Sequence, residues 1–294
     1  MRNHIIFFSG GKASFKVAWW VKKHHPEDNI LLLFTDTSWE DEDLYRFIDE
    51  VSDKLELPLL KLKHGKNPKE LMIDDNFLYN SRVANCSYKL KVVPAKKYIK
   101  KGEFTPTYEY YNEQYLKDKE GIRDNPILYF GIDYKEAHRM NAIVKNWKPY
   151  ECVSPLMEED ISDGLFEEYG IEIPKLYKQG FSHNNCGGRC IKGGQGHWLT
   201  LYKKDRDRFD EMRDFEQAMN VQINEYKGTE GVKYSFMKKK NEPYWLTELE
   251  EDQRDRPEQL DLFDFGVCGC FIDEDMIDDE EEEIDFSIKL TRES

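Results

Sequence analysis

The sequence predicts a doubly wound α/β fold, in which helices cover both faces of a parallel β-sheet, followed by a cysteine-bearing C-terminal extension. Short apolar runs alternate with segments of helical character over the first 150 residues. The run at residues 30–34 is apolar at every position, as in a strand that is buried on both faces. Alternation of strands and helices is typical of parallel sheets, because parallel neighbours need a crossover connection.

The first strand is predicted at residues 4–8 and is followed, after the turn SGGKAS, by a helix at residues 15–23. Residues 41–55 are predicted to form a helix, since their apolar side chains recur at helical spacing. The apolar character of two further segments predicts strands at residues 57–65 and 126–133, and a helix follows at residues 135–147.

The alternation is interrupted twice, which suggests how the chain is divided. Residues 102–124 are polar and rich in tyrosine, so we interpret them as an insertion in an α/β domain spanning residues 1–200. Residues 199–220 read as one charged helix. We therefore predict a helical or irregular extension at residues 201–272 and an acidic tail at residues 273–294.

The charge is unevenly distributed. The formal net charge is −15, and ten carboxylates lie between Asp273 and Asp285 with no basic residue among them. The rest of the chain is only mildly acidic, which speaks against broad binding to a nucleic-acid phosphate backbone. The lysine-rich residues 89–101 do not exclude a local basic groove. There is no apolar run of about 18 residues and no stretch typical of a signal peptide, so we expect a cytoplasmic protein without membrane contact. A homodimer is left open.

The turn between the first strand and the first helix has the composition of an anion site. Gly10 and Gly11 let a ligand approach the backbone, and the amides that open the following helix carry partial positive charge. Ser9 and Ser14 add hydroxyl groups, and Lys12 adds a charge. In a parallel sheet, this turn should meet residues 36–41 and 131–139 beyond the carboxyl ends of the strands.

These stretches resemble the adenine-nucleotide α-hydrolase superfamily and, within it, the phosphoadenosine phosphosulfate (PAPS) reductase and sulfurtransferase family. SGGKAS resembles the pyrophosphate loop S-G-G-x-D-S of that superfamily (the PP-loop), and CSYKLKVVP resembles a C-T-x-x-L-K-x-x-P signature through Cys86 and Lys91. FTDTSWEDED, GIDYKEAHR and residues 170–190 are similar to further family motifs in the same order. The resemblance covers about residues 5–215.

The resemblance implies a site for ATP or a related adenine nucleotide, together with Mg²⁺. It also implies cleavage between the α and β phosphates, coupled to sulfur transfer or reduction on an acceptor that is a metabolite or a nucleic acid. Lys12, Lys91 and Cys270 are the catalytic residues it suggests. Its nucleotide-binding residues are Ser9, Gly10, Gly11, Lys12, Ser14, Thr35, Asp36, Gly131 and Arg139.

Asp36 and Asp41 are candidate magnesium ligands, because hard cations prefer carboxylate oxygen. For Asp41 alone, a helix N-cap is the favoured interpretation. Ala13, Asp133 and Ala137 replace the family's usual aspartate, arginine and serine, and these changes remove contacts that would hold an extra phosphate or sulfate. The alternative function is therefore a nucleotide-binding regulatory or defence-type protein without sulfur chemistry.

The cysteines suggest a second centre. Cys86, Cys186, Cys190 and Cys268 are candidate ligands of a [4Fe–4S] cluster or, with His197, of a structural Zn²⁺. A third interpretation makes Cys268 and Cys270 a redox arm, and a fourth gives the cysteines no shared role. Cys152 is expected to be structural. His183 and residues 184–185 are expected mainly to satisfy backbone groups in their loop.

Overall fold

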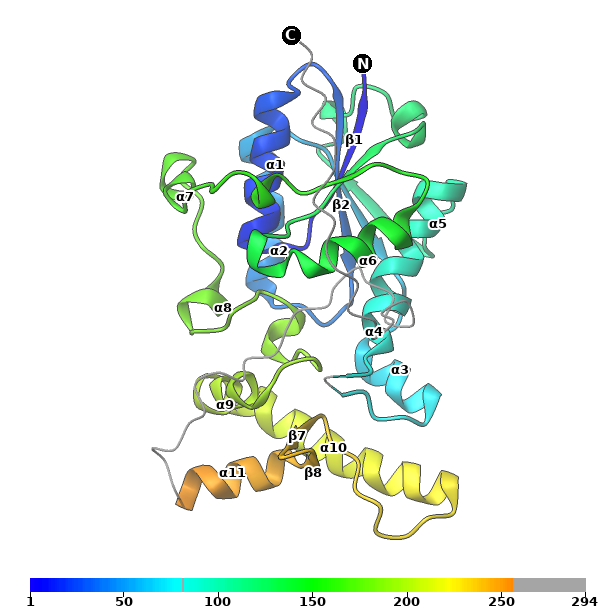
Figure 1. The fold of residues 1–294 in the computed structure, drawn as a ribbon, viewed down its shortest axis with the longest axis vertical. Coiled ribbons are helices and arrows are strands. Elements are labelled where there is room, and N and C mark those ends of the chain that lie inside the picture. The colour runs from blue at the N-terminus through cyan, green and yellow to red at the C-terminus, as the bar shows by residue number, and fades with distance from the viewer. Residues whose placement is uncertain (81, 256–294) are drawn as a thin grey trace.

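The computed structural model of this protein describes residues 1–80 and 82–255. Its main sheet has six strands in the order β4-β3-β2-β1-β5-β6 (Figure 1). The strands are β1 (Asn3–Phe7), β2 (Asn29–Asp36), β3 (Leu59–Lys63), β4 (Thr107–Tyr111), β5 (Ile127–Tyr129) and β6 (Cys152–Val153). The predicted doubly wound α/β fold is confirmed.

One edge of the sheet departs from the prediction of purely parallel strands. β4 lies inside the segment interpreted as an insertion and pairs antiparallel with β3, whereas the other neighbouring strands are parallel. Its residues TYEYY are exposed or partly exposed. An antiparallel edge strand on an otherwise parallel sheet tolerates polar side chains facing water, which is why the segment does not read as a buried strand.

Helices cover both faces of the sheet. α1 (Lys12–His24) and α2 (Glu42–Leu55) pack on one face, against Ile6 and Phe8. α5 (Val93–Lys101) and α6 (His138–Trp147) pack on the other, against Ile5 and Phe7 (Figure 1). Successive residues of a strand point to opposite faces, so one apolar strand supplies both cores.

A third core lies in the helical part drawn below the sheet in Figure 1. Its elements are α3 (Pro68–Asp75), α9 (Gln195–Lys204), α10 (Arg206–Lys227), α11 (Leu246–Asp255) and the hairpin of β7 (Met237–Lys239) and β8 (Glu242–Tyr244). The prediction of one helix over residues 199–220 is wrong, because the chain breaks at Asp205. The carboxylate of Asp205 accepts the backbone N–H of Arg208 at 3.1 Å and so begins a new helix.

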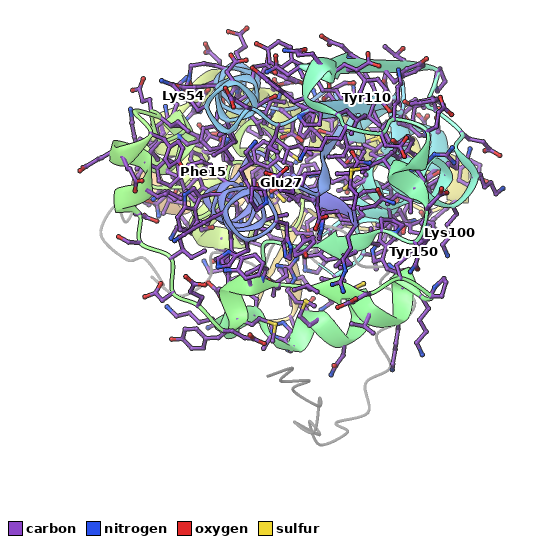
Figure 2. All side chains as sticks on the ribbon, turned by 90° about the horizontal axis from the view of Figure 1, so that it is seen from above. Phe15, Glu27, Lys54, Lys100, Tyr110 and Tyr150 are labelled. Atoms are coloured by element: carbon purple, nitrogen blue, oxygen red, sulfur yellow. The ribbon has the colours of Figure 1, made fainter. Side chains whose placement is uncertain are left out.

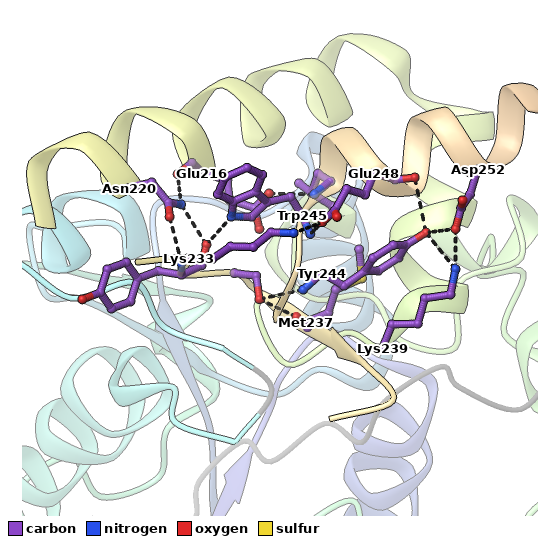
Figure 3. A network of polar contacts seen from close by, with 12 residues as sticks. Glu216, Asn220, Lys233, Met237, Lys239, Tyr244, Trp245, Glu248 and Asp252 are labelled. Carbon is purple, nitrogen blue, oxygen red and sulfur yellow. Dashed lines mark hydrogen bonds and ion pairs between the residues drawn. The ribbon is translucent and has the colours of Figure 1, made fainter. Parts of the chain in front are cut away.

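Buried polar groups hold this helical part together. Glu216 of α10, which is labelled in Figure 3, is fully buried. It accepts the backbone N–H groups of Phe236 at 3.0 Å and Leu246 at 2.7 Å. It therefore fixes the hairpin and the start of α11 on α10. Among residues 1–80 and 82–255, no helix combines the length and the apolar character needed to cross a bilayer.

The strand order places a ligand site between β1 and β5. The chain runs outward from β1 through β2 to β3, and then returns to the other side of β1 with β5. The order therefore reverses at β1 and β5, and open α/β sheets bind ligands in the crevice beyond the carboxyl ends of the strands at such a reversal.

Candidate functional site

A cavity of 280 Å³ lies at the point where the strand order reverses. The turn after β1 contributes Ser9, Gly11 and Lys12, and the loop after β5 contributes Gly131. Arg139 of α6 closes the cavity from the second face of the sheet. Of the residues predicted to bind nucleotide, five therefore line this cavity: Ser9, Gly11, Lys12, Gly131 and Arg139.

The N-terminus of α1 is organised by its own serine. The Ser14 hydroxyl donates to the carbonyl of Gly11 at 2.8 Å and accepts the Gly11 N–H at 3.2 Å. The next amide, that of Lys12, donates to the hydroxyl of Tyr177 at 3.2 Å. Tyr177 belongs to the short helix α8 (Lys175–Lys178), so a distant segment completes the turn. Backbone N–H groups at a helix N-terminus form a site for an anion such as a phosphate.

Each of the three glycines of the predicted site is required for a different structural reason. Gly10 has a φ of +76°, and a Cβ there would lie 2.8 Å from Cγ of Leu44, so this glycine is needed for packing against α2. A Cβ on Gly11 would lie 3.0 Å from the Tyr177 hydroxyl, on the cavity side. A Cβ on Gly131 would lie 2.9 Å from the backbone nitrogen of Ser14, so Gly131 lets the two loops meet.

Two cations of the cavity are paired with carboxylates. Lys12 Nζ lies 3.0 Å from Asp163, which also binds Lys16 at 2.7 Å. Arg139 Nη1 lies 2.6 Å from Glu136. Both pairs can reorganise around an anionic ligand, since the Asp163 side chain is half exposed and that of Glu136 is one-third exposed.

Buried Asn184 reaches the turn from the opposite loop. Its amide nitrogen donates to the carbonyl of Gly10 at 2.9 Å, which is the loop role expected for it. Its amide oxygen is buried and has no hydrogen-bond partner within residues 1–80 and 82–255. Because a buried acceptor without a partner is costly, this oxygen would suit a donor group of a ligand in the cavity.

The predicted magnesium ligands do not face this cavity. Asp36 ends β2, where its carboxylate accepts the Ser38 N–H at 2.7 Å and the Tyr45 hydroxyl at 2.8 Å. Asp41 is the N-cap of α2 and pairs with Arg208 at 2.6 Å. Both carboxylates hold the chain locally, and their role as magnesium ligands stays a prediction. Thr35, the other predicted contact on β2, is buried next to Asp36.

A second, smaller cavity of 20 Å³ brings together three of the predicted thiols, Cys86, Cys186 and Cys190, together with Lys91. Cys86 lies in the short helix α4 (Asn85–Ser87), and Lys91 lies in the π-helical segment η1 (Tyr88–Val92) that follows. π-helical turns are rare in proteins, and those that occur are often found at functional sites. Lys91 therefore lies with the cysteines and not among the residues that line the first cavity.

Glu40 organises the thiol cavity and was not predicted from the sequence. It is fully buried, accepts the Thr37 hydroxyl at 2.8 Å and the backbone N–H of Cys186, and lies 3.9 Å from Lys91 Nζ. Burial raises the pKa of its carboxyl above the ordinary value. The signal for it was a carboxylate just after a buried strand, in the stretch TDTSWED.

The paired cysteines are held in a strained loop. Cys186 has a φ of +54°, which a non-glycine residue rarely adopts. A hydrogen bond with Cys190, together with burial and the charge of Glu40, raises the pKa of the Cys186 thiol. A cavity of 20 Å³ has room for one atom, since a single water needs roughly 10–15 Å³. Cys86, Cys186 and Cys190 line this space, but among the described residues their sulfurs do not form a group whose ligand atoms all lie within 4.8 Å of one another. The choice between an iron–sulfur cluster and zinc stays a prediction.

The remaining candidates lie elsewhere. His197 is buried, and its Nε2 hydrogen-bonds the carbonyl of Gly188 at 2.8 Å; burial lowers the pKa of its imidazole to about 4. Cys152 is in β6 at the edge of the sheet, where burial raises the pKa of its thiol to about 12, as suits a structural cysteine. Cys268, Cys270 and the predicted acidic tail lie outside the described residues.

The first cavity and the thiol cavity are neighbours. Asn185 lines both of them, between Asn184 on one side and Cys186 on the other. Asn185 therefore separates the space at the turn of α1 from the space that the thiols line.

The comparison with known proteins bears on the N-terminal part of the chain. Residues 3–108 match the family model of the phosphoadenosine phosphosulfate reductase domain. The match includes the SGGKAS turn, Asp36, Cys86 and Lys91. It ends before residues 131–139 and 170–190, for which the resemblance remains a prediction. No curated protein matches the chain.

Proposed function

Because residues 3–108 match the family model of the phosphoadenosine phosphosulfate reductase domain, we propose that this chain binds an adenine nucleotide at the turn of α1 and couples its cleavage to sulfur chemistry. The observation that carries the proposal is the pair of adjoining cavities that share Asn185. One offers backbone amides and cations for phosphates, and the other offers thiols.

In the proposed reaction, an oxygen of the acceptor attacks the α-phosphorus of ATP. The bond from that phosphorus to the oxygen bridging to the β-phosphate breaks, and pyrophosphate leaves with the electron pair. The ammonium of Lys12, and its amide once the Tyr177 hydroxyl is displaced, oppose the charge that builds up on the leaving group. A sulfur nucleophile then displaces AMP from the adenylylated acceptor.

The thiol cavity supplies the second half of the proposal. We propose that Cys86, Cys186 and Cys190 hold one metal ion, for which zinc is the natural choice with thiolate ligands. The raised pKa of Cys186 means that its thiol is protonated when no metal is bound, so it is a poor nucleophile in that state. The ion would supply the charge that keeps the sulfurs as thiolates.

The test is the identity of the products. The protein is incubated with MgATP and a panel of acceptors, and the nucleotides are separated by chromatography. AMP with pyrophosphate is expected, and ADP with phosphate would refute the assignment. Lys12→Ala should reduce ATP affinity, whereas Lys16→Ala is a matched control, since Lys16 binds the same Asp163 but does not line the cavity.

A second candidate rests on Ala13, which stands where the family's loop carries an aspartate. In that case the chain is a nucleotide-binding regulator without sulfur chemistry. It would bind ATP with the same dependence on Lys12 and would release neither AMP nor ADP with any acceptor.

A further inference from the structure

At the opposite end of the sheet, where the strands begin, two imidazoles and a carboxylate converge. His4 comes from β1, His25 directly follows α1, and Asp28 directly precedes β2. Nε2 of His4 lies 3.1 Å from Oδ2 of Asp28, and Nδ1 of His25 lies 3.7 Å from the same oxygen. All three atoms lie within 4.8 Å of one another. Figure 2 looks onto this end of the molecule and labels Glu27 of the same turn.

From this geometry we propose that His4, His25 and Asp28 bind a zinc ion, independently of the proposed function. Zinc bonds to imidazole nitrogen at about 2.0–2.1 Å and to carboxylate oxygen at about 2.0–2.2 Å, so neighbouring ligand atoms of a tetrahedral site lie about 3.4 Å apart. The two distances from Asp28 lie on either side of this value. The rings of His4 and His25 are stacked with their centroids 4.4 Å apart, so the partly exposed ring of His25 would turn toward the ion. Water would take the fourth position.

The surrounding contacts orient the three ligands. Nδ1 of His4 lies 3.1 Å from the hydroxyl of Tyr129, which fixes the ring with Nε2 toward Oδ2 of Asp28; an ion would replace this hydrogen bond. Oδ1 of Asp28 accepts the backbone N–H of Arg2 at 2.8 Å, so Oδ2 is the oxygen that faces the imidazoles. The backbone N–H of Asp28 donates to the carbonyl of His25 at 3.1 Å and holds the turn between them.

An ion can reach the three ligands from the surface. His4 is fully buried, whereas the side chains of His25 and Asp28 are about one-quarter exposed, so an ion can enter from their side. The bound ion would tie the start of β1 to the connection between α1 and β2.

The chain offers a matched control in His24. This residue is adjacent to His25 and exposed, and its Nδ1 hydrogen-bonds the carbonyl of Trp20 at 2.8 Å. Zinc bound per chain is measured by elemental analysis after dialysis of the whole protein against zinc. His25→Ala and Asp28→Asn should each lose one ion relative to the wild type, and His24→Ala should lose none.

A thermal scan with and without zinc gives a second readout. Zinc should raise the midpoint of unfolding less in His25→Ala than in His24→Ala. The proposal is overturned if His25→Ala and Asp28→Asn retain the full zinc content. It is also overturned if His24→Ala loses as much zinc as His25→Ala. Cys186→Ser separates this site from the thiol cavity, because the ion that depends on His25 should remain in that variant.

Discussion

The hydroxyl of Tyr177 accepts the backbone N–H of Lys12 at 3.2 Å, although the two residues are 165 positions apart in the chain. The Tyr177 hydroxyl is therefore already hydrogen-bonded to one of the backbone N–H groups with which the turn would bind a phosphate. Lys12 Nζ also lies 5.1 Å from the centre of the Tyr177 ring, so the same residue covers both the amide and the charge of Lys12. A phosphate that binds here must share or displace this hydroxyl.

Tyr177→Phe is expected to increase the affinity for ATP and for pyrophosphate. The variant leaves the Lys12 amide free for the ligand, and one hydrogen bond contributes about 0.5–1.5 kcal/mol, so the dissociation constant should fall by a factor of about 2–10. Calorimetric titration of both ligands measures it, with the exposed Tyr134→Phe as control. Weaker binding by Tyr177→Phe would show that the hydroxyl contacts the ligand instead.

Valine substitutions at the two glycines of the turn should have different effects. Gly10→Val should destabilise the fold by at least about 1–3 kcal/mol, because Gly10 has a positive φ and its Cβ would collide with Leu44. Gly11→Val should leave the unfolding midpoint near that of the wild type and abolish ATP binding, because its side chain would enter the cavity. Urea unfolding and calorimetry on both variants distinguish these effects. Unchanged ATP affinity in folded Gly11→Val would contradict the site.

The turn itself was predictable because its signal is local. A strand, two glycines and a helix occupy the 22 consecutive positions from Asn3 to His24, and the alternation of elements predicts which strand ends meet. Tyr177 and Glu40 were not predictable as parts of the site, because their roles depend on contacts across 165 and 146 positions. Gly10 was assigned to ligand approach, whereas the structure uses it for packing against Leu44.

Cys186→Ser and Cys190→Ser should each lose most of the metal bound by the thiol cavity. Both side chains line it, and serine is a much weaker ligand for zinc than thiolate. Cys152→Ser is the control, since Cys152 lies in β6 and belongs to a different core. Zinc and iron are measured per chain after anaerobic purification. Because zinc must displace the thiol protons, its retention by this cavity should also decrease as the pH is lowered.

A wild type without metal in this cavity would end the ligand hypothesis and favour the redox arm. In that case Cys268→Ser or Cys270→Ser should abolish turnover while leaving the metal content unchanged. Equal metal loss in Cys152→Ser would also contradict the assignment of Cys186 and Cys190 as specific ligands.

The last prediction concerns the pH dependence of stability through Glu216, whose contacts appear in Figure 3. Burial raises the pKa of its carboxyl from 4.5 to about 8 in the folded protein, against the effect of the two backbone N–H groups that it accepts. Between pH 4.5 and 8 the unfolded chain has released this proton while the folded chain keeps it. The stabilisation is therefore complete below pH 4.5 and is lost as the pH rises toward 8.

The free energy of unfolding of the wild type should thus fall across this window, by up to about 1.4 kcal/mol per pH unit from this group. Glu216→Gln removes the titrating group, so the free energy of unfolding of this variant should fall less steeply with pH. The variant should also be less stable than the wild type at every pH, because its amide nitrogen faces a backbone N–H and cannot accept it. Urea unfolding at several pH values measures both slopes, and Glu225→Gln, an exposed position on the same helix, is the control. Equal slopes for the wild type and Glu216→Gln would show that Glu216 is ionised in the folded protein throughout this range.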